Sequence, residues 1–195
     1  MNRRRVLTYA SAGLVGGLSG CLNGKSPDRE DASETGSPTQ TAETPTYECD
    51  AATRPASPGP DADPPGDAER YTYPTRPDSL SDEEVRSYVA RYERAYRLNK
   101  TYSQRGAYLN QVSVTIEETE IYDAPDGAVI VQVAYTYDAE IEGDDGPIEI
   151  DSPLLYASYY VDDEVVLRAV DKKLQENVSR LVVDPITQGQ PVECF

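Results

Sequence analysis

Few residue types in this 195-residue chain could do covalent or acid–base chemistry. The sequence has no His, three Cys and 35 Asp and Glu residues. The lack of His excludes Ser/His and Cys/His nucleophilic systems and His-ligated zinc or copper sites. Acid–base catalysis would have to come from carboxylates, which are too numerous to single out a pair. The sequence therefore predicts no catalytic residue, no metal site and no cofactor.

The first Cys follows a segment with the features of an export signal. Arg3-Arg4 precedes a stretch of about ten small and apolar residues, which is too short to span a membrane. Leu18-Ser19-Gly20-Cys21 comes next and resembles the lipobox of lipoproteins, in which the Cys thiol carries the lipid. We therefore predict a twin-arginine signal peptide over residues 1–20 and lipidation of Cys21. The alternative is a signal cleaved nearby that leaves a free thiol, a liability outside the cell.

The other two Cys residues, Cys49 and Cys194, lie near the two ends of the mature domain. Because an exported protein meets an oxidising compartment, we predict that they are bonded to each other. Closing so long a loop would restrict the unfolded chain by roughly 4–5 kcal/mol in the entropy treatment. Two independent thiols or an intermolecular bridge are the alternatives.

Two further motifs could carry a sugar or a cation. Asn99-Lys100-Thr101 and Asn177-Val178-Ser179 are N-glycosylation sequons, and Asn177 is the better candidate because Asn99 falls on the buried side of an expected helix. Residues 61–67 resemble the start of a calcium loop, but Pro65 occupies a ligand position. We interpret that segment as linker and the acidic turns at 144–145 and 162–164 as solvated.

The charge of the chain indicates its solvent better than its activity. The net charge is −17, and removing the signal with its three arginines leaves 35 acidic against 15 basic residues, about −20. These charges run along the expected helix, strands and loops, a surface that stays hydrated in concentrated salt, where screening removes most self-repulsion. We therefore expect a haloarchaeal origin; an acidic face for a cationic partner is the alternative. Nucleic-acid binding is disfavoured because it needs a basic patch.

Composition divides the mature chain into three parts. Residues 21–46, rich in Thr, Pro and acidic residues, predict a disordered tether. Residues 47–80 are also rich in Pro and should lie extended along the domain if Cys49 is bonded to Cys194. Residues 81–195 are expected to form the α+β domain.

The clearest element of the domain is a helix that begins at Asp82. Ser81-Asp82-Glu83-Glu84 forms a capping box, Leu80 and Val85 a hydrophobic staple, and Gly106 a C-cap. The apolar side follows the helical period and is rich in tyrosine, which we interpret as core. Its members are Val85, Tyr88, Val89, Tyr92, Ala95, Tyr96, Asn99 and Tyr102.

Period-two segments after the helix predict two antiparallel hairpins. The first pairs residues 112–116 with 129–137, and the second pairs 154–161 with 164–169. A loop is expected at 143–147, between the two hairpins. Residues 172–183 fit a helix or a strand, and we favour a strand over Val178–Val183.

This order predicts one N-terminal helix packed on a curved antiparallel sheet of about four to five strands, a cystatin-like or NTF2-like outline. The chain also resembles uncharacterised haloarchaeal twin-arginine-exported lipoproteins. The resemblance rests on the signal and lipobox, the tether, Cys49, Tyr92-Glu93-Arg94-Ala95-Tyr96-Arg97-Leu98-Asn99, Tyr159-Tyr160-Val161 and Cys194. It implies an origin and a membrane topology, but no activity.

Three functions fit these observations. We favour a non-catalytic binding or interaction module, anchored by the lipid on Cys21 to the outer face of the cytoplasmic membrane, whose partner is an envelope protein or a small ligand. The alternatives are a carboxylate-dependent enzyme with a pocket between helix and sheet, and a protease-inhibitor-like module. A core filled by Tyr88, Tyr92 and Tyr135 would argue against the pocket.

Overall fold

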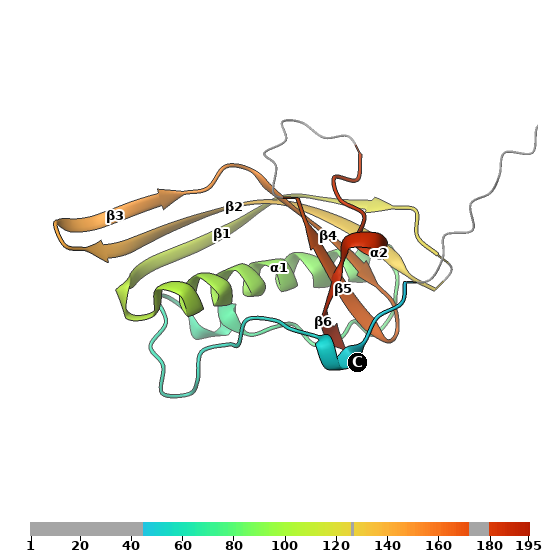
Figure 1. Ribbon diagram of the computed structural model, residues 1–195, viewed down its shortest axis with the longest axis horizontal. Coiled ribbons are helices and arrows are strands. Elements are labelled where there is room, and N and C mark those ends of the chain that lie inside the picture. The colour runs from blue at the N-terminus through green and yellow to red at the C-terminus, as the bar shows by residue number, and fades with distance from the viewer. Residues whose placement is uncertain (1–44, 126, 172–179) are drawn as a thin grey trace, which may run out of the picture. The chain divides into compact units, whose positions relative to one another are not determined.

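The computed structural model describes residues 45–125, 127–171 and 180–195. Cys21 and Asn177 lie outside these residues, so the predictions made for them, for the signal and for nearly all of the tether are not addressed by the fold. The described chain forms one long helix and an open antiparallel sheet of six strands, so the α+β class is confirmed (Figure 1). No helix in this part of the chain is long and apolar enough to cross a membrane.

The helix α1 spans Asp82–Arg105 and so begins and ends where the sequence predicts. The Ser81 hydroxyl accepts a hydrogen bond from the N–H of Glu84 at 3.4 Å. The Glu84 carboxylate accepts from the N–H of Ser79 at 2.8 Å, and no bond from it to the N–H of Ser81 is present, so half of the predicted capping box forms. Gly106 caps the other end with a φ of 49°, a conformation that favours glycine.

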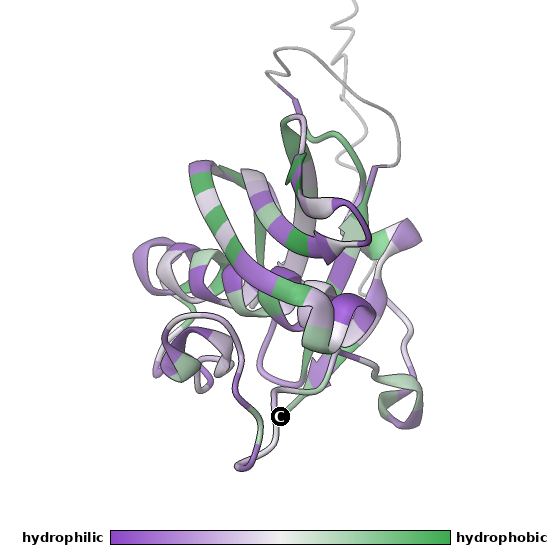
Figure 2. Cartoon of the chain, turned by 90° about the vertical axis from the view of Figure 1, so that its left-hand side faces the viewer, coloured by the Kyte–Doolittle hydropathy of each residue, from purple (hydrophilic) through white to green (hydrophobic). Residues whose placement is uncertain are grey.

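Six strands make up the sheet, and hydrophobic and hydrophilic stripes alternate along its long curved ribbons (Figure 2). The sheet order is β1-β2-β4-β5-β6, and β3 pairs with the distal part of β2. The pairs β1–β2 and β4–β5 are the two predicted hairpins. The strand bounds are β1 Leu109–Tyr122, β2 Val129–Gly143, β3 Gly146–Asp151, β4 Leu155–Val161, β5 Val165–Val170 and β6 Gln190–Cys194.

Two of the six strands, β3 and β6, do not belong to the two hairpins that the sequence predicts. The loop expected at 143–147 is the tight turn of a further hairpin, in which Gly143 pairs with Gly146 and β3 follows directly. Its residues are mostly exposed, so no run of buried apolar residues marks it as a strand. The other unpredicted strand, β6, brings the C-terminus back to pair with β5. β6 is short and contains Pro191, which is typical of an edge strand.

The segment that the sequence left ambiguous is only partly described. Residues 180–183 form bends and not the favoured strand, whereas 172–179 lie outside the described chain. A short helix, α2 (Pro185–Gln188), comes next, with Asp184 as its cap and proline at its first position. The local signal for this turn is therefore the Asp-Pro pair.

The main core fills the space between α1 and one face of the sheet. Tyr88, Tyr92 and Tyr159 are completely buried there, and Tyr135 is 4% exposed. The Tyr92 hydroxyl donates to the carbonyl of Val192 at 3.2 Å, so the polar tip of a core side chain is satisfied by the last strand. The interpretation of the tyrosine side of the helix as core is confirmed.

A smaller cluster lies on the opposite face of the sheet. Ile130, Tyr160, Val165 and Leu167 are buried there, partly by residues near α2. The segment before α2 is attached to this face by a hydrogen bond of 2.6 Å from the N–H of Val182 to the side-chain oxygen of Gln132.

Residues 47–80 pack on the domain and contain two short 3-10 turns, η1 (Cys49–Ala51) and η2 (Ala68–Tyr71). Tyr71 is 1% exposed and belongs to the main core. The side-chain N–H of Asn99 donates to the carbonyl of Tyr71 at 2.8 Å. This stretch therefore contributes to the core, a role that its Pro-rich composition did not predict.

Candidate functional site

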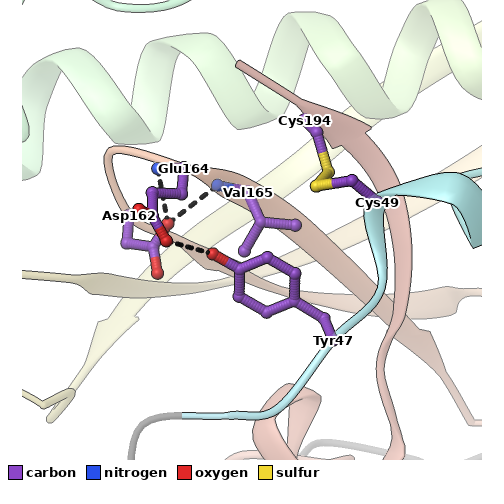
Figure 3. Close-up of a disulfide and its surroundings, with 6 residues drawn as sticks. All are labelled: Tyr47, Cys49, Asp162, Glu164, Val165 and Cys194. Atoms are coloured by element: carbon purple, nitrogen blue, oxygen red, sulfur yellow. Dashed lines mark hydrogen bonds between the residues drawn. A yellow bond between two sulfur atoms is a disulfide. The ribbon is translucent and has the colours of Figure 1, made fainter.

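The predicted cysteine pair lies on the edge of the sheet. Cys49 and Cys194 form a disulfide bond that joins η1 to the end of β6 (Figure 3). Beside it, the hydroxyl of Tyr47 donates to the carboxylate of Glu164 at 2.7 Å, which holds the entering chain against the β4–β5 turn. The arrangement attaches the first described residues to the last strand.

The acidic turn next to the disulfide has a structural explanation. The Asp162 carboxylate accepts hydrogen bonds of 2.8 Å from the backbone N–H groups of Glu164 and Val165, and another from the Tyr160 hydroxyl at 2.9 Å. Such a side-chain-to-backbone pattern shapes tight turns. Within the described residues, no group of three or more acidic or Cys side chains is placed to hold a metal ion.

The first sequon lies on the buried side of the helix, as the sequence indicates. Asn99 is completely buried, and its amide nitrogen bonds the carbonyl of Tyr71 and contacts the hydroxyl of Ser57 at 3.5 Å. An oligosaccharide could not be accommodated there in the folded domain. Asn99 therefore joins the helix to the segment before it and is not an accessible acceptor.

The least expected group in the molecule is a buried ion pair between Glu93 of α1 and Arg168 of β5. The guanidinium donates twice to the carboxylate, with both nitrogen–oxygen distances 2.8 Å. The Tyr159 hydroxyl also donates to Glu93, and the Arg168 guanidinium lies 4.0 Å from the ring centre of Tyr96. The side chains of Glu93 and Arg168 are 0% and 7% exposed.

Burial and charge act on Arg168 in opposite directions. Burial alone would lower the pKa of Arg168, but the charge of Glu93, its hydrogen bond and the nearby Tyr159 and Tyr135 together outweigh burial and raise that pKa well above its usual value. Burial, followed by the charge of Glu93, raises the pKa of Tyr159. Arg168 and Tyr159 therefore keep their protons through the neutral range. The buried ion pair between Glu93 and Arg168 holds α1 against β5.

Sequence reasoning missed this pair, although a signal was present. Glu93 lies four residues after Val89 and three before Tyr96, so it falls on the apolar side of the helix. Arg168 occupies the same sheet face as Val166 and is the only basic residue of the whole sheet. A charge on the buried side of one element predicts an opposite charge on another.

The space where an enzyme pocket was considered is occupied by side chains. Tyr88, Tyr92 and Tyr135 fill it, which argues against the pocket that the carboxylate-dependent alternative required. The hollows of the described surface are open. One is lined by Gln111, Asp138, Ala139, Glu140, Glu149 and Asp151 on the sheet, and another by Asp67, Glu69, Arg70, Thr72, Arg91 and Arg94 beside the helix.

Basic residues are concentrated on α1, where Arg86, Arg91 and Arg105 are exposed, whereas Lys100 is half-buried and Arg97 lies 3.5 Å from the ring centre of Tyr137. After its first turn, the helix carries six basic residues and a single acidic one, the buried Glu93. Burial, followed by the charges of Arg168 and Arg97, lowers the pKa of Lys100, as expected for cations gathered closely. We call this group the basic surface; it consists of Arg86, Arg91, Arg94, Arg97, Lys100 and Arg105.

The β2–β3 hairpin carries the opposite charge, and it extends past the C-terminal end of α1 (Figure 1). We call residues 138–151 the acidic arm; the acidic side chains are Asp138, Glu140, Glu142, Asp144, Asp145, Glu149 and Asp151, and there is no basic one. The charges run along helix, strands and loops but are divided by sign in this region, because the chain has no Lys or Arg between Arg105 and Arg168.

Comparison of the chain with protein-family models, curated proteins and solved structures found no match.

Proposed function

We propose that this chain is a lipoprotein of the haloarchaeal envelope, exported by the twin-arginine route and anchored through Cys21 to the outer face of the cytoplasmic membrane. Its folded part is a non-catalytic binding or interaction module. The Cys49–Cys194 bond carries this proposal, because it suits an oxidising compartment and uses two of the three thiols. The remaining thiol, Cys21, stands in the lipobox.

The fold supports an interaction role more than a catalytic one. The core between helix and sheet is filled, and the polar groups of the Glu93–Arg168 pair are bonded to each other and enclosed. The features that remain exposed are charged surfaces on α1 and on the β2–β3 hairpin. As a fold family we propose the cystatin-like or NTF2-like type, on the order of one helix followed by an antiparallel sheet.

The anchor is tested by changing one cysteine at a time in the producing cell. The wild type should fractionate with membranes, and mass spectrometry of the mature N-terminus should find lipid on Cys21. Cys21→Ser should release the protein, whereas the control Cys49→Ser should remain with the membranes. A mature protein whose Cys21 carries no lipid would overturn the proposal.

The export route has its own test. Replacing Arg3 and Arg4 by Lys together should leave the full precursor in the cytoplasm, because the translocase reads the arginine pair. The control replaces Arg5, which follows the pair, by Lys. Undiminished export of the Arg3→Lys/Arg4→Lys variant would contradict the twin-arginine assignment.

A further inference from the structure

The basic surface and the acidic arm are both left without ionic partners inside the described domain. The ion pairs formed among the described residues involve Arg54 with Glu193 and Arg168 with Glu93, and none involves the basic surface. Three members of that surface, Arg86, Arg91 and Arg105, are exposed. In a chain with 35 acidic residues, three exposed arginines on one helix that form no ion pair with a described residue are unexpected.

The acidic arm places like charges directly opposite one another. Asp138 pairs with Asp151, and Glu140 pairs with Glu149, in consecutive cross-strand positions on the same face. Like charges in such positions destabilise a hairpin. The same face contains the open hollow lined by these four carboxylates. A cationic surface seated on the arm would relieve this repulsion.

We propose that the basic surface of α1 docks on the acidic arm of a second copy of this chain. The inference names the partner of the interaction role proposed above and rests on that role. The charge of each surface matches that of the other. Their lengths are also similar: Arg86 to Arg105 spans about 30 Å of helix, and Asp138 to the tip of the arm spans about 23 Å of strand.

The two surfaces lie on different elements, so the contact is heterologous. A copy whose acidic arm is occupied still has a free basic surface, and a copy whose basic surface is occupied still has a free arm. Association therefore continues copy by copy and forms an open row, unless the rotation between neighbours closes it into a ring.

Salt should control this contact. The net charge of −17 makes whole copies repel each other, and this repulsion acts between centres much farther apart than the facing charges. At about 0.01 M salt the screening length is about 30 Å, so the repulsion between whole copies is felt in full. At about 1 M it is about 3 Å, which removes that distant repulsion but only partly screens charges that touch. Association should therefore rise as the salt concentration rises from about 0.01 M to about 1 M.

The test measures the sedimentation of the full chain carrying Cys21→Ser across this salt series. Association that is weakest near 0.01 M salt and rises toward about 1 M is expected. Arg86→Glu/Arg91→Glu on the helix should weaken it by about tenfold or more, and Glu149→Lys/Asp151→Lys on the arm should do the same. As a matched control, Arg91→Glu is compared with Arg180→Glu, an equal charge change at another exposed arginine.

Mixing the two double variants gives the most specific result. The reversed helix of one matches the reversed arm of the other, so the mixture should associate more strongly than either variant does alone. Circular dichroism confirms that each variant is folded. A chain that stays monomeric at every salt concentration, or a mixture that does not recover association, would overturn the inference and leave the lipid anchor to its own test. Binding of the same chain to vesicles with 30% anionic lipid, without self-association, would also overturn it.

Discussion

The helix α1 and the acidic arm differ in where their acidic side chains lie and in whether these form ion pairs. After its first turn, α1 buries its one acidic side chain, Glu93, against Arg168 and exposes Arg86, Arg91 and Arg105. The arm exposes its carboxylates and sets Asp138 against Asp151 and Glu140 against Glu149. The charges of the buried pair neutralise each other away from water. The carboxylates of the arm lie in water and form no ion pair with a described residue.

The difference separates two kinds of information in the sequence. A charge that loses its water needs a partner inside the molecule, so Glu93 and Arg168 indicate which elements pack together. Exposed charges of one sign are tolerated because water and salt screen them. The arm and the basic surface therefore indicate the solvent and the charge of a partner, and not the fold. Substitutions in the two regions should therefore differ in size and in direction.

Breaking the buried pair should give the largest effect. Glu93→Leu leaves the Arg168 guanidinium buried without its anion and should lower the free energy of unfolding by about 3–5 kcal/mol. Chemical denaturation followed by the helical circular dichroism signal measures this. The control, Glu93→Leu/Arg168→Met, removes both charges and should recover most of the loss. If the double variant is as unstable as the single one, packing and not charge accounts for the effect.

Removing the third member of the cluster should have an intermediate effect. Tyr159→Phe deletes the hydroxyl that donates to Glu93 and should lower the free energy of unfolding by about 1–3 kcal/mol. Denaturation midpoints compare it with Tyr108→Phe, whose side chain is 67% exposed and should be neutral. Equal midpoints for the two variants would mean that the hydroxyl adds nothing to the pair.

Reversing one charge of the arm should stabilise the domain. Glu149→Lys places a cation opposite Glu140 and should raise the free energy of unfolding by about 0.5–1 kcal/mol in monomeric protein at low salt. The gain should shrink in about 1 M salt. Glu149→Gln, which removes the repulsion without adding attraction, should fall between wild type and Glu149→Lys. A destabilised Glu149→Lys variant would show that the like-charge pairs are not under strain.

The smallest effect is expected on the basic surface. The pKa of Lys100 is lowered, by burial first and then by Arg168 and Arg97, so its charge opposes folding at neutral pH. Lys100→Met should raise the free energy of unfolding by less than about 0.5 kcal/mol, because the side chain is only half-buried. This gain is greatest below the folded pKa and disappears as the pH rises toward the unfolded value. Denaturation at pH 7 and 10.5 tests the sign.

Local signals were sufficient to predict most of the fold. The cap at Ser81, the helical period up to Tyr102 and the period-two segments each specify one element, and they identified α1 and two hairpins. The α+β class followed from the order of these elements. The disulfide followed from counting thiols.

What the sequence did not reveal depends on distant contacts. β6 becomes a strand because β5 provides an edge beside it, and Tyr71 becomes core because α1 covers it. The partner of Glu93 lies 75 residues away on another element, so no local window contains both. The opposed carboxylates of the arm become visible only when the register of β2 and β3 is known.

The disulfide also determines how the domain responds to proteases. Cys49 and Cys194 are 145 positions apart, so the bond closes almost the whole folded chain into a covalent ring. A protease that cuts the ring once leaves a single molecule, still attached to whatever precedes Cys49. On a denaturing gel such a nicked protein separates into two fragments only after a reducing agent is added.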